Sequence, residues 1–389
     1  MLLRPTRWSR PLDWLPALSA YIAVVPQTSD LKLYLDARSP DVAPTTVRRI
    51  LERACDHLSI GDQFASVVLL EGMAEPPVVA VSVTDAAEML DCVALDVPRL
   101  EQRATAVVSH ALWVKALVDA IQADLDQAAY VAAPPVPADG LPLVTVRIPT
   151  YGGGHALVER AIPSALASPY PHVEVLVCSD GPQPHARAAV EALGDPRVRY
   201  LELEERPAYP SSPEAFWRSA GSFAANRLLD EARGLFTTPL DHDDAYTFSH
   251  IPLLLDALRR GGLDFVYGQA MTEFPQGAWS LHGSAPLAYG QLNQASVMYS
   301  ARLSHMRYDP HAWLLGEPGD WNLWRRFRDV GAAIGHVSQP VAVHFKERSS
   351  IDHIEPAQQD HPPEVIASDI LGTSARELLT VASRDAGAL

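Results

Sequence analysis

Three carboxylates lie within four positions in the segment FTTPLDHDDAY: Asp241, Asp243 and Asp244. Like charges this close repel each other unless a cation, a helix N-terminus or solvent offsets them. One interpretation is a helix start, in which Asp244 or Thr247 caps a segment that runs through Leu258. The other is a site for a hard divalent cation, Mg²⁺ or Mn²⁺, whose remaining ligand positions are left for substrate phosphates and water.

Polar groups also follow two predicted strands that precede this acidic segment. The run LVTVRIP, at 143–149, is nearly continuous in apolar and β-branched residues, as in a strand buried on both faces, and it leads into Thr150, Tyr151 and three glycines. The glycines form neither a GxGxxG motif nor a P-loop. A second strand, at 173–178, leads into Asp180, which could accept hydrogen bonds from a nucleobase or ribose, or could fix an Asp-Gly turn.

The elements that must position these side chains alternate regularly. A helix is predicted from about 155 to 167, another from about 184 to 193, and a short strand at 198–203. This alternation predicts an α/β fold with a doubly wound, mostly parallel sheet. Such sheets bind ligands at the carboxyl ends of their strands. We therefore expect Asp180 and the acidic segment to share one site, which favours the cation interpretation.

The stretch VAAPPVPADGLP, at 131–142, is rich in proline and glycine and is predicted to be a linker. It separates an N-terminal α/β domain, 1–130, from a second domain at 143–350, which a C-terminal tail follows at 351–389. Within the N-terminal domain we predict strands at 31–35, 64–70 and 77–83. We predict helices at 47–58 and from Leu100 to about Tyr130. No motif there indicates a chemistry. Its role stays open between acceptor recognition, dimerisation and a degenerate nucleotide-sugar fold.

Composition narrows the class of protein. The chain has 389 residues, of which 48% are hydrophobic, enough for two domains. Forty-seven acidic against 31 basic residues give a net charge of -16, which repels a nucleic-acid backbone. The three cysteines have no CxxC spacing, and no N-terminal run has the ~20 apolar residues of a membrane helix. We therefore expect a cytoplasmic protein with no integral membrane segment and no nucleic-acid partner.

Six stretches between about 144 and 348 carry a family resemblance. They are the opening strand with IPTY, the second strand with VCSDG, and the segments GSFAANRLLDEARG, LDHDDA, NQASVMYSARL and GEPGDWNLWRRF. In this order and spacing the chain resembles the family 2 glycosyltransferases, which are nucleotide-diphospho-sugar transferases with the GT-A fold. The resemblance covers most of the second half of the chain and none of the first. It implies a GT-A-like domain preceded by the smaller N-terminal α/β domain.

The resemblance also implies a nucleotide-sugar site. By analogy, the residues that would contact the nucleotide sugar are Pro149, Thr150, Tyr151, Asp180, Asn226 and Asp241. The first three would line the nucleoside pocket and Asp180 would contact the base. Asn226 falls where such enzymes often have Ala-Arg-Asn.

The same analogy implies a metal site and a catalytic base. Asp243 would bind a divalent metal, Mn²⁺ or Mg²⁺, directly, and Asp241 would contact the ribose or the same metal. His344 lies where some members supply a histidine to the metal or diphosphate. Glu317 and Asp320 fall where the family places its catalytic acidic pair, of which the second carboxylate, Asp320, would be the base.

These assignments imply an inverting, metal-dependent, non-processive transferase whose donor is a nucleotide sugar, UDP being the commonest carrier in such a family. The acceptor stays open between a small molecule, a glycan and a peptide, and homo-oligomerisation stays open too. Trp279, His282 and Tyr289 would form an acceptor wall or belong to the core. Two other functions compete: a nucleotidyltransferase, and a non-catalytic module that binds a nucleotide or glycan.

Overall fold

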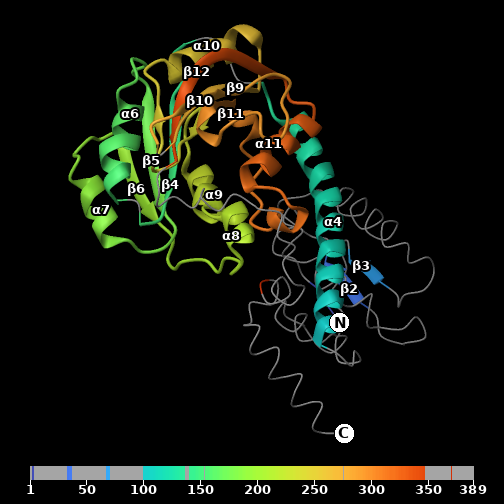
Figure 1. Ribbon diagram of the computed structural model, residues 1–389. Helices are drawn as coiled ribbons and strands as arrows, with labels where there is room; N and C mark the ends of the chain where they lie inside the picture. The colour runs from blue at the N-terminus through green and yellow to red at the C-terminus, as the bar shows by residue number, and fades with distance from the viewer. Residues whose placement is uncertain are drawn as a thin grey trace. The chain divides into compact units, whose positions relative to one another are not determined.

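The computed structural model describes residues 2–3, 33–36, 67–70, 100–135, 140–152, 154–274, 276–346 and 369 (Figure 1). The chain divides into two compact units, one made of 1–125 with 360–389 and the other of 126–359. Within the described residues, no helix combines the length and the apolar character needed to cross a bilayer.

Among its described residues, the first unit contains three short parallel strands in the order β1-β2-β3. These are β1 (Leu2–Leu3), β2 (Leu33–Asp36) and β3 (Val67–Leu70). The strands predicted at 31–35 and 64–70 are thereby confirmed, and the long helix predicted from Leu100 is α4 (Leu100–Ala132), which runs across the division between the units. The helix predicted at 47–58 and the strand at 77–83 lie outside the described residues. The proposed domain and linker boundaries remain predictions.

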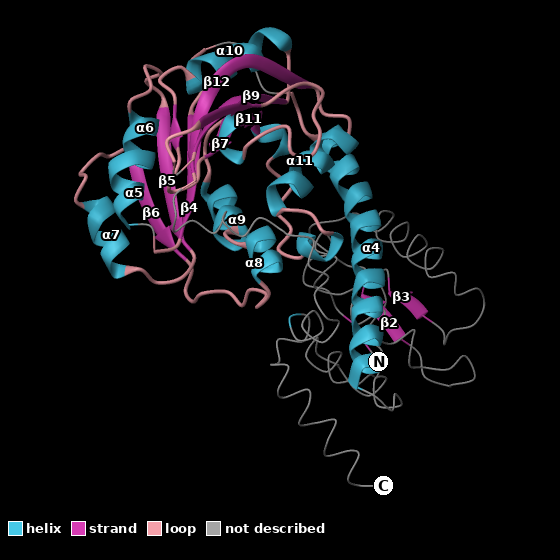
Figure 2. Cartoon of the chain, in the orientation of Figure 1, coloured by secondary structure: helices cyan, strands magenta, loops and turns pink. Residues whose placement is uncertain are grey.

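The second unit is built on a nine-stranded sheet in the order β6-β5-β4-β7-β11-β9-β12-β8, with β10 paired to β9 (Figure 2). Its strands are β4 (Val144–Thr150), β5 (Val173–Ser179), β6 (Val198–Glu202), β7 (Phe236–Pro239), β8 (Ala245–Tyr246), β9 (Phe265–Glu273), β10 (Trp279–His282), β11 (Val297–Ser300) and β12 (Ile334–Phe345). The strands from β6 to β7 pair in parallel. The other half is mixed, because β11 runs antiparallel to both of its neighbours while β9 and β12 are parallel.

Helices cover both faces of this sheet, which confirms the predicted doubly wound α/β class. One face carries a helical run made of α5 (Gly154–Ala156), a π-helical turn (Leu157–Ala161) and α6 (Ile162–Leu166), together with α7 (Pro184–Glu191) and α10 (His250–Gly261). On the other face lie α9 (Ser222–Glu231) and α11 (Gly319–Asp329). Shorter helical segments connect them: α8 (Pro213–Ser219) and the 3₁₀ turns η3 (Gln294–Ser296), η4 (Ala301–Leu303) and η5 (Ala312–Leu315).

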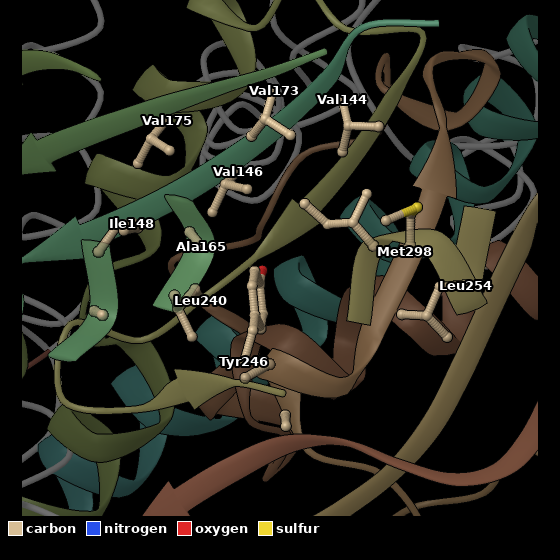
Figure 3. Packing of buried hydrophobic residues seen from close by; sticks show 14 of the residues in the cluster. Val144, Val146, Ile148, Ala165, Val173, Val175, Leu240, Tyr246, Leu254 and Met298 are labelled. Atoms are coloured by element: carbon tan, nitrogen blue, oxygen red, sulfur yellow. The ribbon is translucent and has the colours of Figure 1, made fainter. Parts of the chain in front are cut away.

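Alternating side chains of the central strands supply the core on both faces. In β5, Val175 and Val177 belong to a buried cluster with residues of α6 and α10, whereas Leu176 and Cys178 belong to a separate buried cluster with Ala224 and Leu228 of α9. Figure 3 shows the first of these clusters, in which the valines of β4 and β5 gather beside Ala165 and Leu240. Each fully buried valine or leucine contributes about 1.5–3 kcal/mol. The sheet is thereby a rigid base, and its strand ends have fixed positions.

Candidate functional site

A cavity of about 1110 Å³ lies at the carboxyl ends of β4, β5 and β7. It gathers most of the side chains that the sequence singles out, from segments up to 195 residues apart along the chain. Those lining it are Pro149, Thr150, Tyr151, Asp180, Asp241, Asp243, Asp320 and His344. The two that do not line it are Asn226 and Glu317.

The ends of β4 and β5 present buried oxygen atoms to the cavity. Thr150 Oγ1 and Asp180 Oδ1 are buried and have no hydrogen-bond partner. Burial raises the pKa of Asp180, while a hydrogen bond from Tyr209 and the charge of Arg206 act against that rise. A buried carboxylate oxygen without a partner is costly, so this wall favours a ligand that donates a hydrogen bond.

The turn after Asp180 requires glycine. Gly181 has φ +114°, and a β carbon there would come within 3.0 Å of the backbone nitrogen of Arg206. This close approach brings Arg206 to the cavity, where its guanidinium carbon lies 3.9 Å from the centre of the Tyr151 ring. The sequence analysis missed Arg206, because it lies in a loop with no motif around it.

The three aspartates of the acidic segment lie in different environments. Asp241 Oδ1 accepts a hydrogen bond from Gln294 Nε2 over 2.8 Å. Asp243 lines the cavity, and its backbone oxygen accepts a bond from Arg160 over 2.6 Å. Asp244 is completely buried. The helix expected to run through Leu258 is present as α10, but it begins at His250 with Ser249 at its N-cap, so neither Asp244 nor Thr247 caps it, and β8 follows the acidic segment directly.

Asp244 fixes the ring of His344. The ring nitrogen Nδ1 lies 3.0 Å from both oxygens of Asp244, and the Phe345 amide donates to Oδ1 over 3.1 Å. Burial raises the pKa of Asp244, and the His344 ring opposes that rise. A carboxylate bound to one ring nitrogen fixes the orientation of the imidazole ring.

Asp243 and His344 fit a divalent cation that takes few ligands from the protein. Mg²⁺ and Mn²⁺ typically bind one or two protein carboxylates plus substrate phosphates. Mn²⁺ can also accept an imidazole ligand, although imidazole binds Zn²⁺ more strongly. Among the described side chains, no group of three or more His, Cys, Asp or Glu is arranged to hold a metal without a substrate. A cation bound by Asp243 and His344 would take its other ligands from substrate or water.

Arg160 supports this part of the site from the π-helical turn. Besides its bond to Asp243, its guanidinium carbon lies 4.0 Å from the centre of the Phe345 ring. One side chain thus connects the acidic segment to the strand that carries His344. Irregular helical turns of this kind are frequent at functional sites.

Another part of the cavity wall is built around the start of α11. Asp320 lies in the first turn of α11, where its Oδ1 accepts a hydrogen bond from the Trp321 amide over 2.7 Å. Beside it, Tyr308 and Trp324 line the cavity, and the Tyr308 hydroxyl and Trp324 Nε1 are buried without hydrogen-bond partners. This wall therefore presents unpaired donors.

Glu317 and Asn226 act behind this wall. Glu317 forms a two-point ion pair with Arg325, over 2.8 and 3.0 Å, and accepts a bond from Asn322 over 2.8 Å. Asn226 makes two 2.8 Å hydrogen bonds with the backbone of Tyr308. These contacts hold α11 and the Tyr308 loop in place and leave neither side chain on the cavity surface.

The expected acceptor wall is present in part. His282 and Tyr289 line the cavity, whereas Trp279 is 54% exposed and is not among the lining residues. Ser280 and His282 lie on one face of β10, and Trp279 lies on the opposite face, because successive side chains of a strand alternate.

Comparison with known proteins bears on the segment that contains the first two strand ends. Residues 145–212 match the sequence model of the family described as Glycosyl transferase family 2. An uncharacterized glycosyltransferase of Rickettsia bellii is 35% identical over 107 residues, which are 27% of this chain and 13% of that protein. The uncharacterized glycosyltransferase RP339 of Rickettsia prowazekii is 32% identical over 105 residues, 27% of this chain and 28% of that protein. The chain thus spans little more than a quarter of the second relative and less of the first.

Two solved structures show looser similarity. Staphylococcus aureus TarS 1-349 in complex with UDP-GlcNAc has a TM-score of 0.41 at 13% identity, covering 55% of this chain and 61% of that one. The mannosyltransferase PcManGT from Pyrobaculum calidifontis, in complex with GDP-Man and Mn²⁺, has a TM-score of 0.42 at 15% identity. The alignment covers 77% of this chain and 86% of that one.

The sequence match coincides with the first strand-end motifs and extends beyond them through α7 and β6. The resemblance seen in the motifs is confirmed over residues 145–212, which match glycosyl transferase family 2.

Proposed function

We propose that this protein is an inverting, metal-dependent, non-processive glycosyltransferase that uses a nucleoside-diphosphate sugar as donor. The observation that carries the proposal is that Asp180, Asp243 and Asp320 line the same cavity, although they come from three separate parts of the fold. A glycosyl transfer requires three things of a site: recognition of a base, neutralisation of a departing diphosphate, and removal of a proton from the acceptor.

Recognition of the base is assigned to the ends of β4 and β5. The unpaired Asp180 Oδ1 could accept a hydrogen bond from a ring N–H, which uracil and guanine both carry. Tyr151 offers an aromatic face, backed by the guanidinium of Arg206. Of these two bases we favour uracil, and therefore a UDP-sugar as the donor.

Stabilisation of the leaving group is assigned to Asp243 and His344. A divalent cation bound by them would act as a Lewis acid and neutralise the diphosphate as it departs. Asp244 keeps the His344 ring oriented, and Arg160 keeps Asp243 next to it. Lys346 also lines the cavity, after the end of β12, and its charge suits phosphate oxygens.

Asp320 is assigned the role of general base from the wall around α11. Attack by the acceptor from the side opposite the diphosphate inverts the anomeric carbon in one displacement, so no enzymic nucleophile is needed. The carboxylate would accept the acceptor's proton, a contribution of typically ~10²- to 10⁴-fold. The acceptor is proposed to be a small molecule, a glycan or a peptide.

A panel of nucleoside diphosphates tests the site. With Mn²⁺ present, UDP at about 100 times its Kd should add ~2.7 kcal/mol to the free energy of unfolding and raise Tm by several degrees, and EDTA should remove the increase. Asp180→Asn should weaken that response. Asp256→Asn, an exposed position on α10, is the matched control and should leave it unchanged.

Turnover separates the proposal from its competitors. Slow Mn²⁺-dependent hydrolysis of UDP-sugars, releasing UDP, supports a glycosyltransferase. Stabilisation by nucleotide without turnover of any donor would instead favour a binding module, and release of pyrophosphate from a nucleoside triphosphate would favour a nucleotidyltransferase.

A further inference from the structure

The last two turns of α4 bond to two different elements, although they lie outside the stretch that carries the family resemblance. Asp126 is buried and accepts hydrogen bonds from Nε and Nη2 of Arg326 on α11, over 2.9 and 2.6 Å. One turn later, the Tyr130 hydroxyl donates to Asp264 over 2.7 Å. Because residues four apart lie on the same side of a helix, one short stretch of α4 holds both α11 and the residue before β9.

Tyr130 attaches this stretch to the sheet. Asp264 immediately precedes β9, and its Oδ2 also accepts a bond from the Ala333 amide, just before β12, over 3.0 Å. Arg302, in the 3₁₀ turn directly after β11, donates to the Tyr130 backbone oxygen over 3.3 Å and to Asp264 over 3.4 Å. Its guanidinium carbon lies 4.0 Å from the centre of the Tyr130 ring. Tyr130 is therefore held at the ends of three strands of the sheet.

Arg326 continues the connection to the cavity wall around α11. It lies on the helix that carries Asp320 and Trp324, which both line the cavity. Its Nη1 donates over 2.8 Å to the backbone oxygen of Arg307, directly before Tyr308, which also lines the cavity. A guanidinium makes its bonds in one rigid plane, so the positions of α4, α11 and the Tyr308 backbone are set together.

We propose that Asp126 and Arg326 are positioning residues for the wall that carries Asp320. Anchored to the sheet through Tyr130, α4 fixes where α11 and the Tyr308 segment stand, and a displacement of about 1 Å at a reacting group can cost ~10²-fold in rate. The role of Asp320 as base rests on the proposed function, whereas the placement of the wall does not. The ends of β4 and β5, proposed to bind the nucleotide, are held by the parallel strands instead.

The placement of the wall can be read without any substrate. The full chain is labelled with 5-fluorotryptophan, and the ¹⁹F signal of Trp321, whose amide is bonded to Asp320, is assigned by its loss in Trp321→Phe. We expect Asp126→Ala to shift or broaden this signal. Arg326→Lys keeps the charge but cannot make all three bonds, so it should shift the signal less. Gln127→Ala, at an exposed position on the same turn of α4, is the matched control and should leave the signal unchanged.

Turnover tells whether this placement matters for the reaction. Asp126→Ala should lower kcat by ~10- to 100-fold while the Kd of UDP with Mn²⁺ stays within about twofold of the wild type. Leu254→Ala is the control for general loss of stability, because Leu254 is buried in the core cluster on the face of the sheet that carries α10. Assayed below its unfolding transition, that variant should keep the kcat and the Trp321 signal of the wild type.

The outcomes are distinct. A folded Asp126→Ala variant with an unchanged Trp321 signal overturns the inference, and so does an equal fall of kcat in Leu254→Ala, because stability and not position would then set the rate. If Asp126→Ala does not fold, Arg326→Lys decides: a wild-type signal and a wild-type kcat in that variant would contradict the inference. Failure of the wild-type chain to turn over any donor would reject the proposed function and leave the ¹⁹F signal to judge the placement of the wall.

Discussion

The two walls of the cavity leave different polar groups without hydrogen-bond partners. At the ends of β4 and β5 these are the Thr150 hydroxyl and a carboxylate oxygen of Asp180, whereas around α11 they are the Tyr308 hydroxyl and the indole N–H of Trp324. Under the proposed function, the carboxylate oxygen of Asp180 would accept a hydrogen bond from a nucleobase, and the wall around α11 would receive the acceptor. We therefore propose that the two walls contact different substrates.

The walls also differ in how they are built. The first follows from strands and the loops directly after them, so neighbouring residues in sequence remain neighbours in space. The second depends on long-range contacts, such as the bond of Asn226 to the Tyr308 backbone and the ion pair of Arg326 with Asp126 from α4. We therefore expect substitutions at the second wall to act on turnover and stability, and those at the first to act on nucleotide binding.

The largest effect is expected at Asp320. Asp320→Asn keeps the shape of the second wall but removes the proton acceptor, so kcat should fall by ~10²- to 10⁴-fold. Nucleotide binding, measured by thermal shift with UDP and Mn²⁺, should remain close to that of the wild type. A variant that turned over at the normal rate would show that the second wall does not hold the base.

A stability effect is expected where α4 meets α11. Asp126 is 2% exposed and receives two hydrogen bonds from Arg326, over 2.9 and 2.6 Å. Arg326→Met removes two charge-assisted hydrogen bonds from that buried carboxylate and should lower the free energy of unfolding by about 3–5 kcal/mol, as read by urea denaturation. The control is Arg260→Met, because Arg260 is 82% exposed and its ion pair with Asp256 should contribute little.

Asp243→Asn tests the proposed metal site in the loop after β7. Without the carboxylate, the Mn²⁺-dependent part of the UDP-induced Tm rise should disappear, as it should when EDTA is added to the wild type. UDP binding in the absence of metal should change little. Full Mn²⁺-dependent stabilisation in this variant would mean that the cation binds elsewhere.

The smallest effect is expected at Glu317. Because it pairs with Arg325 instead of lining the cavity, Glu317→Gln should reduce kcat less than tenfold and cost about 1 kcal/mol of stability. A loss of turnover as large as that of Asp320→Asn would restore Glu317 to the catalytic role that the family resemblance implied.

Much of the second unit could be predicted from local pattern. The strands that become β4, β5 and β6 bury apolar side chains, and their limits were predicted within one or two residues. The antiparallel placement of β11 between β7 and β9 was not predictable, because no local pattern specifies a distant pairing partner. Arg147 illustrates the same limit: the sequence places it in a strand, but only packing against Thr237 and Tyr299 buries its charge.

The sequence by itself determined which residue types follow each strand of the parallel half, and therefore the wall proposed to receive the nucleotide, because strand ends and their loops are local features. The tertiary structure alone decided that Asp244 orients His344 across 100 residues, that Glu317 turns to Arg325, and that Tyr308 and Trp324 stand beside Asp320. Hydrogen-bond partners of buried groups are set by which elements pack together, and that choice belongs to the whole fold.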